Sequence, residues 1–177
     1  MRSPLVGFTV EHTAQLVCAL RWVITQTSDL AERWSKQSED DEQHVWLAIL
    51  ARHFQAHLIA FEELQPDSKR MAPYRTPAPA KPEIKDALHA AASLCTDAET
   101  QLAFLNTVVV EPLIAACQQI ETIGASHCDA PLMRVATALR QQLQTCAAAL
   151  SATKDSDTLS RATALLDREG GLLSDLL

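Results

Sequence analysis

Two histidines spaced four residues apart are the most specific chemical feature of the sequence. His53 and His57 fall in a segment expected to be helical, where residues four apart share a face. They lie on the same side as Trp46, Leu50 and Phe61, so we expect both imidazoles to face the protein interior. Two imidazoles at this spacing suit a transition metal, and a single one suits the axial position of a haem.

A metal site would need a further ligand from another helix. His12 lies at the edge of the apolar stripe of the first helical segment and is the candidate third ligand. The alternative is that His53 and His57 are half-buried residues without a ligand, hydrogen-bonded to neighbours such as Thr27 or Asn106. On that alternative no cofactor is expected.

No other pattern in the sequence indicates catalysis. There is no Gly-x-Ser-x-Gly motif and no phosphate-binding glycine loop, and Cys128 is adjacent to His127 in sequence only. The five cysteines are well separated and include no Cys-x-x-Cys pair, which favours reduced thiols over zinc ligands or a redox pair. We predict no catalytic residues.

Composition and charge restrict the class of protein. The chain has 177 residues, 47% of them hydrophobic, and only four glycines, which favours an all-α fold. The net charge of −7 and the scattered basic residues are not those of a nucleic-acid binder. With no secretory signal at residues 1–15 and no apolar run of ~18 residues, we expect no membrane association and a cytoplasmic location.

Apolar periodicity predicts the helices that would position these residues. Four main helices are expected, over 8–35, 40–64, 97–123 and from Asp129 to about Thr153. Short helices are expected over 83–94 and 157–168, and the tail LLSDLL is expected to pack back or to dock on a partner. The sequence Thr96-Asp97-Ala98-Glu99 has the form of a capping box, and Pro112 is expected to kink the third main helix.

Residues Pro66 to Pro82 decide how the helices connect. This segment holds five of the eight prolines and follows one helical hairpin and precedes another. Fully extended it reaches ~50 Å, enough to run the length of the bundle as one long crossover between helices two and three. We therefore expect a single domain over 1–177, with a core bundle at 8–153, a crossover at 66–82, and a C-terminal helix and tail at 154–177.

The chain resembles the ferritin-like superfamily in this topology and in two stretches. These are LARHFQAHLIAFEELQP, residues 50–66, and FLNTVVVEPLIAACQQIE, residues 104–121. The resemblance implies a four-helix bundle with a long crossover. In the di-iron members it also implies a Glu from each of two helices and Glu-x-x-His from the other two, all pointing inward.

The di-iron ligands that this resemblance implies are missing from the sequence. The second helix has Glu62 and Glu63 without a His three residues later, and the fourth has no Asp or Glu from Pro131 to Thr153. The carboxylates of the first and third helices point away from the apolar stripes: Glu11, Asp29, Glu32, Glu111 and Glu121. We therefore predict a divergent member without a di-iron site.

Trp22 lies nearly opposite the apolar stripe of the first helix. An exposed indole beside Cys18 and Ala14 indicates that this face is covered by the additional helices or by a second subunit. We expect a homodimer through the first helix, with Trp22 as a candidate interface residue.

Three hypotheses follow for the function. The first is a non-catalytic ferritin-like bundle that acts as an interaction or structural module, with a homodimer or an unidentified protein as its partner. The alternative is a metal- or haem-binding protein that uses His53 and His57. The third is a carrier of a small apolar ligand, which requires that Pro112 and the alanine-rich fourth helix leave a cavity in the bundle.

Overall fold

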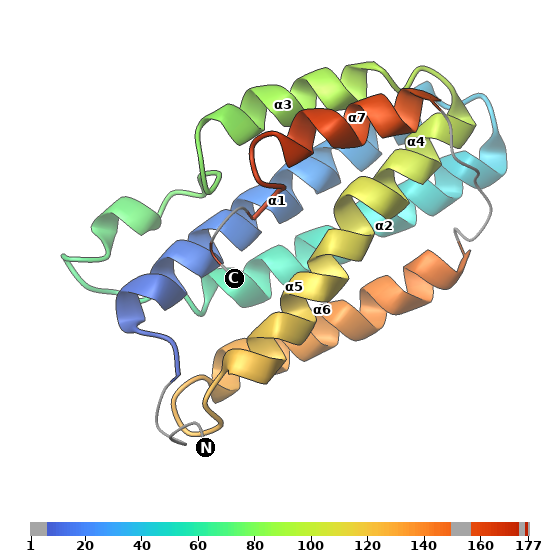
Figure 1. Ribbon diagram of the computed structural model, residues 1–177. Coiled ribbons are helices and arrows are strands. Elements are labelled where there is room, and N and C mark those ends of the chain that lie inside the picture. The colour runs from blue at the N-terminus through green and yellow to red at the C-terminus, as the bar shows by residue number, and fades with distance from the viewer. Residues whose placement is uncertain (1–6, 150–156, 174–175, 177) are drawn as a thin grey trace.

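The computed structural model describes residues 7–149, 157–173 and 176, and every regular element within these residues is a helix (Figure 1). The all-α prediction is confirmed. The α-helices are α1 Val10–Gln37, α2 Asp41–Glu62, α3 Glu83–Ser93, α4 Ala98–Phe104, α5 Glu111–Ile123, α6 Ala130–Ala149 and α7 Asp157–Asp167.

Local sequence signals set the ends of α1 and α2. Thr9 caps α1 by accepting a hydrogen bond from the backbone N–H of His12, and Asp40 caps α2 by accepting one from that of Glu42. Only residues 38–40 join the two helices, so the chain folds back at once. α1 and α2 therefore pack as antiparallel neighbours, as the loop length predicted.

The proline-rich segment 66–82 differs from the extended strap expected from the sequence. Its own backbone hydrogen bonds form a 3-10 turn, Ala72–Tyr74, which packs on α1 at one end of the bundle (Figure 1). A folded turn is too short to span the bundle. Instead α3 runs beside α1 in the same direction and carries the chain back, so that α4 and α5 run in the same direction as α2.

α4 and α5 form one continuous helix with a wide turn between them. Residues Leu105–Val110 are π-helical, and the backbone N–H of Glu111 donates to the carbonyl of Asn106, five residues earlier. The wide turn lies directly before Pro112, which has no N–H to donate. The irregularity of this helix is therefore a π turn over Leu105–Val110, which ends two residues before Pro112.

The predicted capping box lies one residue from the observed cap. The side chain of Asp97, not of Thr96, caps α4 by accepting a hydrogen bond from the backbone N–H of Thr100 at 2.9 Å. At the start of α6, one carboxylate oxygen of Asp129 accepts from the backbone N–H groups of Ala125 at 2.8 Å and Phe8 at 3.1 Å. Asp129 thereby joins the N-terminal segment to the loop before α6.

The C-terminal part of the chain packs back onto the bundle. α7 lies against α3 and α4, and the chain then turns through Gly170 and Gly171, whose φ angles of 87° and 79° favour glycine. Leu172 and Leu173 are buried against the core. The predicted end of the fourth helix near Thr153 lies outside the described residues.

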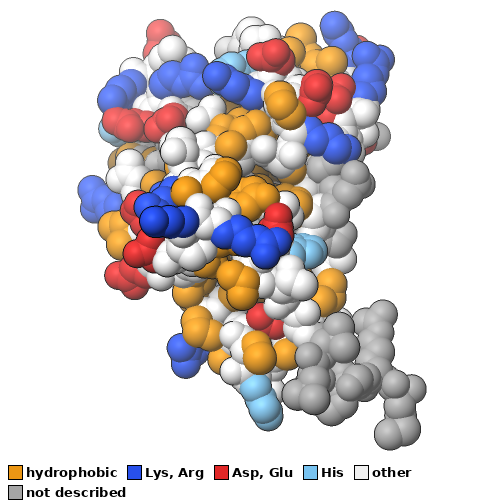
Figure 2. Space-filling model, turned by 90° about the vertical axis from the view of Figure 1, so that its left-hand side faces the viewer, with side chains coloured by type: hydrophobic (Ala, Val, Ile, Leu, Met, Phe, Trp, Pro, Cys, Tyr) orange, Lys and Arg blue, Asp and Glu red, His pale blue; other side chains and the backbone are white. Residues whose placement is uncertain are grey.

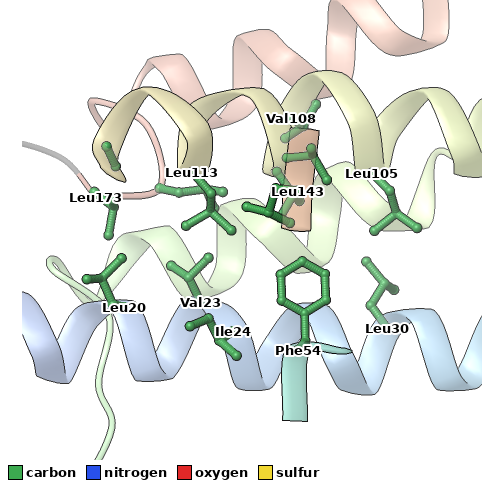
Figure 3. Packing of buried hydrophobic residues seen from close by; sticks show 14 of the residues in the cluster. Leu20, Val23, Ile24, Leu30, Phe54, Leu105, Val108, Leu113, Leu143 and Leu173 are labelled. Atoms are coloured by element: carbon green, nitrogen blue, oxygen red, sulfur yellow. The ribbon is translucent and has the colours of Figure 1, made fainter. Parts of the chain in front are cut away.

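Leucine, valine and phenylalanine side chains from every layer meet in the interior. Figure 3 shows Val23 of α1 and Phe54 of α2 on one side of this interior, facing Leu113 of α5 on the other. Trp34 packs edge-on against Phe104 with ring centroids 5.9 Å apart. A cavity of about 240 Å³ lies beside Pro112, between α5 and the C-terminal residues 170–173, and no described residue of α6 lines it.

One helical stretch in the described part of the chain, Ala98–Ile123, is long and apolar enough to cross a membrane. No such stretch was expected from the sequence. Core helices of soluble proteins pass the same test, and half of the most apolar window of this helix is buried inside the protein.

Candidate functional site

Trp22 is buried, and this corrects the interface predicted on α1. Its side chain is only 6% exposed. The thiol of Cys18, one helical turn away, donates to the carbonyl of Thr76 at 3.3 Å, so the segment 66–82 lies along this face of α1. Of the two covers expected for Trp22, a segment of the same chain is the one present, so Trp22 is not the exposed residue that was predicted.

Arg21 is a buried cation that joins three segments. It donates to the carbonyl of Arg75 at 2.8 Å and to the carboxylate of Glu62 at 3.1 Å, while its side chain is 7% exposed. Its Nε has no hydrogen-bond partner among the residues that the structure describes. The guanidinium therefore fixes the crossover and the end of α2 to α1, and we assign it a structural role.

His53 and His57 lie at the seam between α2 and α6, where both are half-buried. Burial lowers the pKa of His57 below its ordinary value. The charge of the nearby His53 lowers this pKa further, whereas a hydrogen bond with Gln142 raises it. The neighbour that the structure supplies is thus Gln142 of α6, and not Thr27 or Asn106.

His12 occupies a different environment. Its Nε2 lies 2.7 Å from the carbonyl oxygen of Leu176, and its ring contacts that of Phe8 with centroids 5.2 Å apart. Across residues 7–149, 157–173 and 176, no three His, Cys, Asp or Glu side chains come together in a way that could hold a metal ion. The structure therefore does not bring His12 to His53 and His57.

The thiols are mostly buried and held in the neutral form. Burial raises the pKa of Cys117 to about 12 and that of Cys95 to about 11, and it also raises the pKa of Cys18 and Cys146. A thiol is nucleophilic only as its thiolate. These four side chains are therefore poor nucleophiles near neutral pH.

The charged groups at the crossover end of the molecule are of both signs. Figure 2 looks at this end and shows Lys and Arg side chains interspersed with Asp, Glu and hydrophobic ones. Arg70 pairs with Glu11 at 3.1 Å, and Arg75 pairs with Asp67. This face has mixed charge and offers no uniform field to a charged partner.

The outward face of α2 is the most unusual surface of the protein. Three of its side chains are large, apolar and exposed, namely Val45 at 54%, Ile49 at 48% and Ile59 at 63%. Their spacing places them on one side of the helix with two exposed alanines. We call this set the α2 stripe: Asp41, Val45, Ala48, Ile49, Arg52, Ala56, Ile59 and Glu63.

Charged residues divide the α2 stripe in a regular way. An acidic residue lies at each end, Asp41 and Glu63, and Arg52 lies midway between them. None of these three side chains pairs with another residue in the parts of the chain that the structure describes. The surface therefore combines exposed apolar side chains with three charges that no described residue pairs, which are negative, positive and negative along the helix.

Arg21 and the α2 stripe are the features that sequence reasoning missed. Arg21 was overlooked because its partner on the crossover is a backbone carbonyl, which leaves no sequence signal. The stripe had a signal, because α2 carries apolar residues on all sides and such a helix is normally buried all round. Comparison of the chain with protein-family models, curated proteins and solved structures gives no match.

Proposed function

We propose that this chain is a non-catalytic helical bundle of ferritin-like arrangement that acts as a protein-interaction module. The arrangement is supported by α2 and the α4–α5 helix running in the same direction, with a long connection between them (Figure 1). The interaction role is supported by the α2 stripe.

The observation that carries the proposal is the exposure of Val45, Ile49 and Ile59 on one face of one helix. Single exposed apolar side chains are common on protein surfaces, but a row of them at helical spacing is typical of a surface that receives another helix. The stripe from Asp41 to Glu63 is ~33 Å long at ~1.5 Å per residue, which suits a partner helix of about 22 residues.

Charge selects the kind of partner. If two copies of the chain paired through α2 in antiparallel fashion about Arg52, Asp41 would lie opposite Glu63 and Arg52 opposite its own counterpart. A parallel pair would place every charge against itself. Like charges at three points oppose self-pairing, and they favour a different helix with basic residues at both ends and an acidic residue midway.

The partner we propose is therefore an amphipathic helix of inverted charge order. The apolar contacts supply affinity, and the charges supply selection and faster association at low salt. Because the order of charges is the same from either end of the stripe, it fixes the chemistry of the partner and leaves its direction open.

The experiment uses two synthetic helical peptides of about 22 residues, the length of the stripe at ~1.5 Å per residue. Both carry the same leucine stripe. One has lysines at its ends and a glutamate midway, and the other has these charges inverted. We expect the lysine-ended peptide to bind at least about tenfold more tightly, measured by fluorescence anisotropy at low salt.

Variants of the protein locate the binding surface. We expect Ile49→Asp to abolish binding and Gln118→Asp, an exposed change on α5, to leave it intact. The double variant Asp41→Lys, Glu63→Lys should prefer the inverted peptide. Equal binding of both peptides would overturn the charge argument, and a dimer in sedimentation velocity that Ile49→Asp removes would show that the occupant is a second copy.

A further inference from the structure

A second surface, unrelated to the α2 stripe, lies between α1 and α3. The C-terminal halves of these helices and the turn leading into α4 line a cavity of about 380 Å³ that is open to solvent. This volume lies within the ~300–1,000 Å³ range of small-molecule sites. No residue of α2 lines the cavity, so a helix on the α2 stripe would not cover it.

The floor of the cavity is apolar. Leu30 and Trp34 of α1 lie on one side, and Leu88 and Ala92 of α3 lie on the other. Trp34 is held in place by its edge-on contact with Phe104, so its exposed edge is a fixed part of the floor. A hydrocarbon chain or an aromatic ring fits such a floor.

The rim of the cavity is polar and carries unengaged groups. Gln26, Arg33 and Gln37 approach from α1, and His89 approaches from α3. Arg33 and His89 have no hydrogen-bond or ion-pair partner within the described residues. A guanidinium free of protein partners beside an apolar floor is suited to a carboxylate, which it binds through two parallel hydrogen bonds.

Arg33 is the permanently charged side chain of the rim, since no Asp, Glu or Lys among the described residues lines the cavity itself. Arg33 and His89 also line an adjoining groove together with Asp29 and Glu32. In that groove Glu32 is paired with Lys36 at 2.7 Å. Asp97, next to the cavity wall, is engaged in capping α4.

We propose that this cavity binds a small amphipathic carboxylate, with the carboxylate at Arg33 and the apolar body against Trp34 and Leu88. The binding is non-covalent, because the thiol of Cys95, which also lines the cavity, has its pKa raised by burial to about 11 and stays protonated. Further polar groups of a ligand would meet the amides of Gln26 and Gln37.

The experiment is an NMR titration of the ¹⁵N-labelled full chain with 4-phenylbutyrate. We expect saturable shifts of amides in α1 and α3 around the cavity and of the Trp34 indole N–H, with a dissociation constant on the order of 1 mM for a ligand of this size. The neutral amide, 4-phenylbutanamide, should bind about tenfold more weakly, because it lacks the charge that Arg33 recognises.

Two variants test the assigned contacts. Arg33→Gln should reduce the affinity for 4-phenylbutyrate about tenfold and leave that for the amide unchanged, whereas Arg52→Gln, the same change in charge on α2, should alter neither. Ala92→Phe fills the cavity and should abolish binding of both ligands with the amide spectrum otherwise preserved. Absence of saturable shifts in the wild type, or equal affinities for the wild type and Arg33→Gln, would overturn the proposal.

Discussion

α1 and α2 form one hairpin, yet the two helices differ in what covers them. α1 is enclosed, since α2 packs on one side and the segment 66–82 and α3 lie along the other. α2 is packed against α1 and α6 but leaves the α2 stripe exposed. α2 has a higher proportion of hydrophobic residues than α1. The more apolar of the two helices is therefore the one with more contact with solvent.

This difference shows that the connection between the hairpins determines which helix is free. The chain from 66 to 97 has to return along the bundle, and it does so on the α1 side. Trp22 and Cys18 are buried by that return path. The apolar face of α2 that no described residue covers is what we interpret as the binding surface.

The largest expected effect is the difference in the free energy of unfolding between substitutions at two adjacent residues of α2, one buried and one exposed. Leu50 is 1% exposed and Ile49 is 48% exposed. Leu50→Asp places a charge in the core and should abolish cooperative folding, a cost above about 4 kcal/mol, whereas Ile49→Asp should change the free energy of unfolding by less than about 1 kcal/mol. Chemical denaturation followed by circular dichroism measures both, and a folded Leu50→Asp would show that α2 is rotated from the orientation described.

The next effect tests the cover over α1. Trp22→Ala should lower the free energy of unfolding by about 3–5 kcal/mol, because it empties a buried indole site. The matched variant on the open helix, Ile59→Ala, should change it by less than about 0.5 kcal/mol. Similar small effects of the two substitutions in urea titrations would mean that the crossover does not cover Trp22.

A smaller effect is expected at the junction of the crossover with both helices. Arg21→Ala removes a buried side chain and leaves the carbonyl of Arg75 without its donor, so it should cost about 2–4 kcal/mol. Glu62→Ala removes the exposed partner of the ion pair and should lower the free energy of unfolding by less than about 1 kcal/mol. Equal losses of stability in the two variants, measured by urea denaturation, would show that the ion pair, and not the contact with the crossover, is what matters.

The sequence predicted the helices more accurately than their covering. The expected ranges 8–35 and 40–64 end within two residues of the observed α1 and α2, because the signals that set helix ends, such as the caps Thr9 and Asp40, act within one turn of the chain. The side of α1 on which the crossover lies depends on contacts between residues far apart, such as Cys18 with Thr76. The apolar periodicity of a sequence does not indicate which side chain hydrogen-bonds to a backbone carbonyl far along the chain.

The candidate sites illustrate the same limit. The spacing of His53 and His57 predicted a shared face, and both lie at one seam, but that spacing says nothing of which residues oppose them. The opposing residue is Gln142, and His12 lies with Leu176 instead. The isoleucines of the α2 stripe were visible as apolar residues, whereas their exposure depends on how far α6 reaches around α2.

The smallest effect expected is the pH dependence contributed by His57. Burial places the pKa of His57 in the folded protein below its ordinary 6.5, so the unfolded chain binds that proton more readily. This contribution to stability is present above about pH 6.5 and is lost as the pH falls from there through the folded pKa. Between about pH 7.5 and about pH 5, His57→Gln should therefore lose less stability than the wild type in thermal denaturation; an identical pH profile would contradict the assignment.

Hydroxyl-radical footprinting of the full chain, alone and with the lysine-ended peptide, compares the exposed α2 stripe with the covered face of α1 in one measurement. In the free protein we expect Ile49 and Ile59 to be oxidised and Trp22 to be protected despite its high intrinsic reactivity. We expect the peptide to protect the α2 residues and to leave the rest of the pattern unchanged. Rapid oxidation of Trp22 in the folded protein, or no protection of Ile49 and Ile59 when the peptide is present, would contradict it.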